Sequence, residues 1–345
     1  MKYRLYTTSQ KAWDGMFRAI AAAKESVYLE MYILLGDTRK THDFLGILKK
    51  KARAGLEVVV IADALGSSEL PAKIVQDLRD SGIEFIYFSH WFRRTHRKLL
   101  IIDKKIVFIG GVNIEEKIRD WRDIQIRLSG SVVKPFLKSF AYAYSMVGGK
   151  KESVLAYSRL PMSQKIKSWV TDNFPSTNKI YYLNHYYQRK IVEAVSLIQI
   201  ITPYLLPPRR LIALLDDACR RGVRVEIMIP ENTGIKPLNK VNYLNACRLS
   251  ALGVKVYVIP GMNHAKVLLI DSEEGLIGSQ NMDILSFNFN VEVGVFFRQK
   301  ALVRDLSVII DKWKGESREF MDAVDKIKIW DRILITILKI FYPIL

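Results

Sequence analysis

Short runs of consecutive apolar residues alternate along this chain with stretches in which apolar residues recur every three or four positions. Two of the runs, LEVVVIA and VRVEIMIP, are β-branched and apolar almost throughout, as in strands that are buried on both faces. Each follows a helical pattern that ends at a glycine, Gly55 or Gly222, the residue type that most often ends a helix. Strands and helices in this order predict βαβ units in a mixed, largely parallel sheet that helices cover.

The same order of elements occurs twice. The segments SVYLEMYIL, FLGILKKKARAGLEVVVIAD and HRKLLIIDKKIVFIGGVN correspond to IQIITPYLL, LIALLDDACRRGVRVEIMIP and HAKVLLIDSEEGLIGSQN. We therefore predict two α/β halves, 1–149 and 179–314, separated by a connector at 150–178. The connector is expected to carry one short helix around residues 164–170.

The tail, residues 315–345, has its own pattern. From about Glu319 apolar residues recur at three- and four-residue steps, and lysines and arginines flank the apolar stripe. This pattern predicts an amphipathic helix lying on an anionic lipid surface. A terminal helix packed on the protein core, or a dimer contact, is the competing interpretation.

The chain is strongly basic. Its 53 Lys and Arg residues against 35 Asp and Glu residues give a net charge of +18, which favours a polyanionic partner, either nucleic acid or an anionic membrane. No apolar leader opens the sequence and no window of about 20 apolar residues occurs, so we predict neither a secretory signal nor a transmembrane helix. The two cysteines have no C-x-x-C spacing, which indicates a reducing compartment.

The repeat contains a polar motif, H-x-K-x4-D-x6-G-[GS]-x-N, in both copies at a constant offset. The first copy consists of His96, Lys98, Asp103, Gly110, Gly111 and Asn113, and the second of His264, Lys266, Asp271, Gly278, Ser279 and Asn281. A lone histidine at the start of a strand is ordinarily a structural residue. The duplication argues against that interpretation for this pair, while it is kept for the three other histidines.

The spacing within the motif suits phosphate chemistry. Side chains alternate along a strand, so each histidine shares a face with the lysine two residues later, and such a pair can grip a phosphate and exchange a proton or a bond with it. The two asparagines, with the lysines, are candidate phosphate ligands. The motif aspartates fall on the opposite face before a turn, so within the candidate catalytic set we expect Asp103 and Asp271 to be mainly structural. Zinc is disfavoured because a lysine follows each histidine and no cysteine or histidine cluster completes a metal site.

At these motifs the sequence resembles the phospholipase D superfamily, and in LEMYIL, WRDIQIRLSG, TPYLLPPRRL and SFNFNVEVGV it is similar to bacterial cardiolipin synthases. The resemblance runs from about residue 24 to residue 314. It implies two α/β halves related by a pseudo-twofold axis, a phosphohistidine intermediate and no metal or other cofactor. It further implies that Asp123 and Glu292 orient the histidines, and it makes Glu30 and Tyr204 candidate pocket residues.

The resemblance leads to two function hypotheses and a minor third. The first is a peripheral, cytoplasmic-side phosphatidyltransferase that converts two molecules of phosphatidylglycerol to cardiolipin and glycerol, with His96 as the nucleophile and His264 as the general acid and base. The second is a phosphodiesterase or nuclease of the same superfamily, because the positive charge suits DNA equally well. A non-catalytic lipid-binding protein is disfavoured because both motifs are intact. The oligomeric state stays open.

Overall fold

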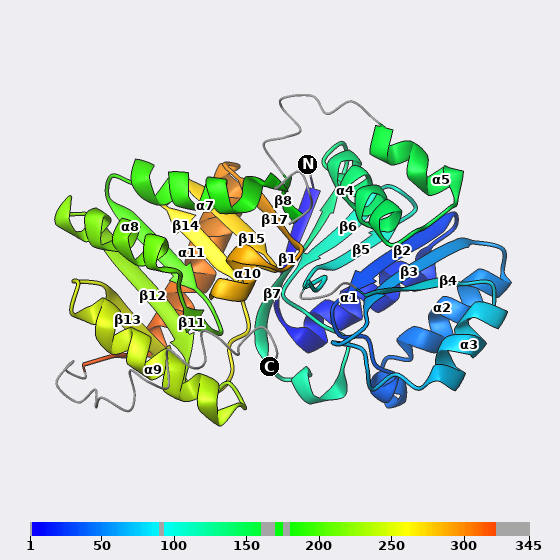
Figure 1. Cartoon of the computed structure of the whole chain (residues 1–345), viewed down its shortest axis with the longest axis horizontal. Coiled ribbons are helices and arrows are strands. Elements are labelled where there is room, and N and C mark those ends of the chain that lie inside the picture. The colour runs from blue at the N-terminus through cyan, green and yellow to red at the C-terminus, as the bar shows by residue number, and fades with distance from the viewer. Residues whose placement is uncertain (1, 90–92, 160–169, 175–179, 322–345) are drawn as a thin grey trace.

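The computed structural model describes residues 2–89, 93–159, 170–174 and 180–321. The predicted tail helix and most of the predicted connector helix lie outside these residues. Figure 1 shows the two halves side by side, each with a sheet and flanking helices. The expected division into two α/β halves is therefore visible in the arrangement of the elements.

The first half is built on a seven-stranded sheet with the strand order β1-β7-β6-β5-β2-β3-β4. Its elements are β1 (Lys2–Thr8), α1 (Ser9–Ala22), β2 (Ser26–Met31), η1 (Asp37–Lys40), α2 (Phe44–Arg53), β3 (Glu57–Asp63), α3 (Ala72–Asp80), β4 (Glu84–Phe88), β5 (Lys98–Ile102), β6 (Ile106–Gly110), η2 (Glu116–Ile118), β7 (Arg122–Ser129), α4 (Val133–Met146), α5 (Glu152–Leu155) and η3 (Ala156–Arg159).

The second half is built on a nine-stranded sheet with the order β18-β13-β12-β10-β14-β15-β17-β8-β9. Its elements are β8 (Val170–Phe174), β9 (Ile180–Tyr181), α7 (Tyr182–Glu193), β10 (Leu197–Ile201), β11 (Leu205–Leu206), α8 (Arg209–Arg220), β12 (Arg224–Pro230), α9 (Lys236–Ser250), β13 (Lys255–Ile259), β14 (Val267–Ile270), β15 (Glu274–Gly278), β16 (Met282–Asp283), α10 (Ile284–Asn288), β17 (Glu292–Phe297), α11 (Lys300–Gly315) and β18 (Arg318–Glu319). The short strands β11 and β16 pair with each other outside this sheet.

Both sheets are mixed, as expected, but their parallel parts are smaller than expected. Among the described strands of the two sheets, β2-β3-β4 and β10-β12-β13 are parallel and the other neighbours are antiparallel. The motif segments account for the difference, because each forms a tight hairpin, β5–β6 or β14–β15. A tight hairpin can only join antiparallel strands. Gly55 and Gly222 end their helices with positive φ angles of 87° and 83°, as predicted.

Three apolar cores hold the layers together. One lies under α1, α2 and α3 on the outer face of the first sheet, and a second lies under α7, α8 and α9 on the outer face of the second sheet. The third core contains residues of both sheets together with α4 and α11. Because this core is shared, neither half can bury its inner face alone.

The segment expected as a connector contributes to the second sheet. Strand β8 pairs antiparallel with β17, so that Asn173 lies opposite Glu292 and Asp172 opposite Val293. At the other end of the described chain, β18 pairs with β13. No helix among the described residues is long and apolar enough to cross a bilayer.

Candidate active site

The two motifs meet where the halves adjoin. The backbone N–H of His96 donates to the carbonyl of Val291 at 3.0 Å, and that of His264 donates to the carbonyl of Arg122 at 2.7 Å. Each histidine is thus hydrogen-bonded through its backbone to the opposite half. Since Val291 and Arg122 directly precede Glu292 and Asp123, these two bonds fix where the carboxylates lie.

The carboxylates pair with the histidines crosswise between the halves. Nδ1 of His96 lies 3.1 Å and 3.2 Å from the two carboxylate oxygens of Glu292, and Nδ1 of His264 lies 2.8 Å from Oδ2 of Asp123. All four side chains are buried. A carboxylate at Nδ1 favours the tautomer that carries the proton there, which leaves the Nε2 lone pair free to react. The two motifs therefore build one site, in which each half supplies the orienting group for the other.

Burial sets the protonation of the histidines. Burial, reinforced by the neighbouring Lys98, lowers the pKa of His96 to about 4, and burial with the two motif lysines lowers the pKa of His264 well below its ordinary value. Both imidazoles are accordingly neutral near pH 7. A neutral imidazole is the form that can attack phosphorus or accept a proton.

The two carboxylates differ in their titration. Burial raises the pKa of Asp123 to about 7, although Lys266 and the N–H of Ile124 oppose the shift. Burial acts on Glu292 in the same direction, but His96 and Lys98 outweigh it and hold its pKa below the usual value. The pair His264–Asp123 therefore retains a proton near neutral pH more readily than the pair His96–Glu292.

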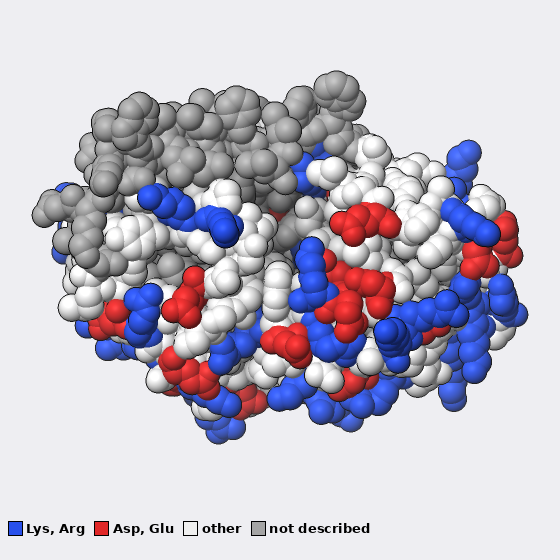
Figure 2. All heavy atoms as spheres, turned by 90° about the horizontal axis from the view of Figure 1, so that it is seen from below, with Lys and Arg blue, Asp and Glu red and all other residues white. Residues whose placement is uncertain are grey.

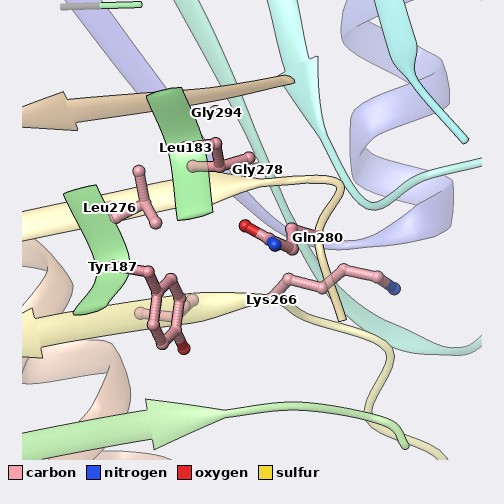
Figure 3. A pocket seen from close by; sticks show the side chains of 8 residues that line it. Leu183, Tyr187, Lys266, Leu276, Gly278, Gln280 and Gly294 are labelled. Atoms are coloured by element: carbon pink, nitrogen blue, oxygen red, sulfur yellow. The ribbon is translucent and has the colours of Figure 1, made fainter. Parts of the chain in front are cut away.

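Both motif lysines lie beside the histidines. Nζ of Lys98 donates to the carbonyl of His96 at 2.6 Å, and Nζ of Lys266 donates to the carbonyl of His264 at 2.5 Å. Burial lowers the pKa of Lys98 well below its usual value and that of Lys266 to about 7. A bound phosphate would favour the charged form of both lysines. In Figure 3 the Lys266 side chain lies beside Gln280, along one side of a small cavity.

Aromatic rings lie against both histidines. The centroid of the Tyr32 ring lies 4.9 Å from that of His96, and the rings of Trp121 and Tyr204 lie 5.6 Å and 6.4 Å from that of His264. Tyr204 was expected near the pocket, whereas Tyr32 and Trp121 were not. The repeat could have revealed Tyr32, because Y in LEMYIL and Y in ITPYLL occupy equivalent positions.

The small motif residues are required by close packing. A Cβ on Gly110 would lie 2.1 Å from the carbonyl oxygen of Ile124, and one on Gly111 would lie 2.3 Å from a carboxylate oxygen of Asp123. At the position equivalent to Gly111 the second half has Ser279, whose hydroxyl donates to Glu292. The longer glutamate thus leaves room for a hydroxyl where the aspartate does not.

The motif asparagines are both buried at the site. Asn113 accepts a hydrogen bond from the indole N–H of Trp13 through its backbone carbonyl, at 2.8 Å. Among the described residues, Oδ1 of Asn281 is buried without a hydrogen-bond partner. An unsatisfied buried amide oxygen needs a hydrogen-bond donor, such as a substrate hydroxyl or water, so it does not itself support the predicted contact of Asn281 with a phosphate oxygen.

The motif aspartates bind the backbone of their own half. The carboxylate of Asp103 accepts from the N–H groups of residues 24, 25 and 26, at the start of β2. Asp271 does the same for residues 195, 196 and 197, at the start of β10. Both aspartates adopt positive φ angles, 49° and 52°, in the hairpin turns. Their position is that of structural residues, at the hairpin ends of β5 and β14 and remote from the histidines at the other ends.

Glu30 was expected to line the pocket, but it lies behind the motif. Its side chain is fully buried, and one carboxylate oxygen accepts a hydrogen bond from Thr95 at 2.6 Å. Thr95 directly precedes His96. The sequence pattern could not show this, because a glutamate inside an apolar strand is compatible with either face.

Among the described residues, no cluster of three or more histidine, cysteine, aspartate or glutamate side chains could hold a metal ion. The buried cations and imidazoles around the site are instead suited to a phosphate group. The arrangement can do nucleophilic chemistry on a phosphodiester with its own side chains.

Comparison with known proteins agrees with this geometry. The family model described as "Cardiolipin synthase, PLD-like domain" matches residues 16–131 and 187–313. The chain belongs to this phospholipase D-like family. The expected superfamily, the mixed α/β fold and the enzyme class are thereby confirmed.

Individual members of the phospholipase D-like family match over most of the chain. Cardiolipin synthase A of Pseudomonas putida (strain GB-1) is 28% identical over 92% of this chain and 69% of its own length. The probable cardiolipin synthase YwiE of Bacillus subtilis (strain 168) is 27% identical over 92% of this chain and 66% of its own length. The chain thus spans about two thirds of the length of these relatives.

Solved structures share the fold at low sequence identity. A phosphatidylserine synthase of Haemophilus influenzae superimposes with a TM-score of 0.73 at 15% identity, covering 99% of this chain and 93% of that one. A polyphosphate kinase of Porphyromonas gingivalis gives 0.67 at 13% identity, covering 98% of this chain and 53% of that one. These likenesses establish the phospholipase D-like fold.

Proposed function

We propose that the protein is a cardiolipin synthase-like phosphatidyltransferase, which converts two molecules of phosphatidylglycerol to cardiolipin and glycerol. The observation that carries the proposal is the crossed arrangement of two neutral histidines, each held by a buried carboxylate of the other half. The names of the relatives support the choice of substrate. A site with two such histidines can cleave a phosphodiester in two displacement steps.

In the first step, Nε2 of His96 attacks phosphorus, and the bond from phosphorus to the glycerol oxygen of the headgroup breaks. The His264–Asp123 pair gives its proton to that oxygen, so glycerol leaves neutral. In the second step, a hydroxyl of the acceptor phosphatidylglycerol attacks phosphorus, its proton passes to His264, and the bond to His96 breaks. Cardiolipin is released and the starting protonation returns.

The assignment of the two histidines follows from their carboxylates. A nucleophile that becomes positively charged is stabilised by a carboxylate that stays ionised, as the low pKa of Glu292 favours. A general acid needs a pair that keeps a proton near pH 7, as the raised pKa of Asp123 favours. Both arguments favour His96 as the nucleophile and His264 as the acid.

We also propose that the protein acts at the cytoplasmic face of a membrane. The net charge of +18 supports attraction to anionic lipid. In Figure 2, basic side chains are spread over the visible face with acidic ones among them, so the charge there is not gathered in one patch. Sedimentation with anionic liposomes tests the tail: a chain ending at Ser317 should bind less than the full chain, and equal binding would refute a role for the tail.

Incubation with phosphatidylglycerol vesicles, followed by mass spectrometry of the lipids, tests the activity. The wild type should produce cardiolipin, and His96→Asn and His264→Asn should each lower the rate at least about a hundredfold. His185→Ala is the matched control, because this histidine is exposed and outside the motifs. Phosphatidic acid as the main product would mean hydrolysis in place of transfer, and an unchanged lipid pool would contradict a lipid substrate and favour nucleic acid.

A further inference from the structure

A buried charged network lies behind His96, and within the part of the chain that the structure describes it has no counterpart behind His264. Arg97, the residue between His96 and Lys98, is fully buried, as is Glu30, and Nε of Arg97 lies 3.4 Å from a carboxylate oxygen of Glu30. Because side chains alternate along an extended segment, Arg97 points away from the face that His96 and Lys98 share. It therefore has no direct access to a phosphate in the site.

Arg97 is linked to strand β8 through helix α4. Its Nη2 donates to the hydroxyl of Ser139 at 2.5 Å, and that hydroxyl donates in turn to Oδ1 of Asp172 at 2.8 Å. Asp172 lies opposite Val293 in the pairing of β8 with β17. Val293 directly follows Glu292, the carboxylate that binds His96.

These contacts form a closed ring. The ring runs from His96 through the chain to Arg97, then through Ser139 and Asp172 to β17, and returns from Glu292 to Nδ1 of His96. Every step is a covalent bond, a hydrogen bond or a strand pairing. Movement of β17 relative to the first motif would break at least one of these contacts, so the ring fixes the distance between Glu292 and the imidazole.

The described residues of the second half form no equivalent ring. Ala265 stands where the first motif has Arg97, and β1, which pairs with β7 as β8 pairs with β17, contains no acidic residue. The residue equivalent to Glu30 in the repeat is Thr202. The two halves of the site thus share their reacting groups but not the residues that support them.

The cost of this network shows that packing alone does not explain it. A buried arginine with carboxylates on two sides loses its hydration, and an apolar residue of similar size is often equally stable at such a position. In the second half, the position equivalent to Arg97 holds Ala265, an apolar residue that is itself fully buried. A charged network that is present behind His96 and not behind His264 is therefore expected to position side chains of the site and not to stabilise the fold.

We propose that Arg97 is a positioning residue for the reaction and that, together with Ser139 and Asp172, it holds Glu292 against His96. This support makes the two pseudo-symmetric histidines functionally unequal. The inference rests on the proposed function, because it assumes that His96 is the histidine whose orientation limits turnover. It adds residues that touch neither the substrate nor the reacting atoms.

A double-mutant cycle tests the coupling. Arg97→Ala should lower kcat at least about tenfold with KM changed less than about threefold, since the loss is one of orientation. In an enzyme that already carries Glu292→Gln, Arg97→Ala should lower kcat less than about twofold, because the contact between residue 292 and His96 is already impaired. In an enzyme that carries Asp123→Asn the full effect should remain, because Asp123 serves the other histidine.

Two further variants separate positioning from folding. Ser139→Ala keeps every charge and removes only the link between Arg97 and Asp172, so it should reproduce part of the loss in kcat. Lys190→Ala breaks another buried ion pair, in which Nζ lies 3.2 Å from Glu274, and should lower Tm without lowering kcat per folded molecule. The proposal would be overturned if Arg97→Ala lowered kcat equally in the wild type, in Glu292→Gln and in Asp123→Asn, or if it left kcat unchanged.

A spectroscopic readout needs no substrate and so separates this inference from the proposed function. A histidine Nδ1–H that donates to a carboxylate gives a proton NMR signal far downfield of ordinary amides, and the site should give two. Arg97→Ala should broaden or shift the signal of His96, assigned through His96→Asn, and leave that of His264 in place. A change in both signals, or in neither, would contradict the ring, whereas a wild type that fails to transfer phosphatidyl groups would contradict only the proposed function.

Discussion

Replacing Asp103 by asparagine should destabilise the protein without impairing its chemistry, although this aspartate belongs to the duplicated motif. The carboxylate accepts three backbone N–H groups, from Lys24, Glu25 and Ser26, at 2.7–3.0 Å. Asparagine tolerates the positive φ of 49° at this turn. The replacement therefore removes the charge and leaves the backbone conformation available.

The size of the effect follows from these three bonds. A hydrogen bond to a charged group contributes about 1.5–3 kcal/mol when it is shielded from water. Two of the three N–H groups at Asp103 are exposed, so water replaces much of what is lost, and we expect a total of about 1–2 kcal/mol. That corresponds to a fall in Tm of about 1–3 °C for a chain of this length.

The pH dependence gives a second signature. Burial alone would raise the pKa of Asp103, but the N–H groups of residues 24–26 outweigh it and hold the pKa below its usual value. A carboxylate whose pKa is lowered by folding contributes stability above its unfolded pKa of about 4 and loses it as the pH falls through the folded value. The difference in Tm between the wild type and the variant should accordingly shrink below about pH 4.

Thermal unfolding and lipid turnover on the same preparations test this reasoning. We expect kcat per folded molecule to stay within about threefold of the wild type, since the carboxylate contacts neither histidine. Asp271→Asn, at the equivalent turn with a φ of 52°, should behave in the same way. A variant with an unchanged Tm and a kcat reduced more than about thirtyfold would refute the structural role.

Three further predictions concern the site itself. Gly111→Ala should lower kcat about a hundredfold, because the added Cβ would lie 2.3 Å from an oxygen of Asp123 and displace it from its histidine. Ser279→Gly, the reciprocal change, should lower kcat only about three- to tenfold, as measured by steady-state kinetics, since it removes one hydrogen bond to Glu292 and creates no clash. The profile of kcat/KM should fall above about pH 7, because the His264–Asp123 pair must hold its proton and Lys266 must be protonated, and the pKa values of Asp123 and Lys266 both lie at about 7. Lys266→Arg should make this fall less steep, and an unchanged steepness would exclude this lysine.

The sequence was sufficient to predict the features that the two halves share. The equal spacing of the two motifs indicated one shared site, and the alternation of side chains along a strand placed His96 and Lys98 together and Asp103 apart. Gly55 and Gly222 marked helix ends because only a positive φ fits there. These inferences depend on local geometry, which the order of residues determines.

What the sequence could not show depends on contacts between the halves. The crossed pairing of His96 with Glu292 joins residues 196 positions apart, and no local spacing encodes it. The sheets are mainly antiparallel because the motif hairpins turn the chain back, a feature that the apolar runs alone do not reveal. Glu30 illustrates a third difficulty, since its partner Arg97 could be recognised only after β2 and β5 were placed side by side.

Trapping of the covalent intermediate tests the central claim most directly. Wild-type enzyme is mixed with phosphatidylglycerol radiolabelled in the phosphate, quenched within one turnover, digested and mapped by mass spectrometry. We predict an acid-labile phosphatidyl adduct on the peptide that contains His96, and none on the peptide that contains His264. An adduct on His264, or turnover without any adduct, would contradict the proposed assignment of nucleophile and acid.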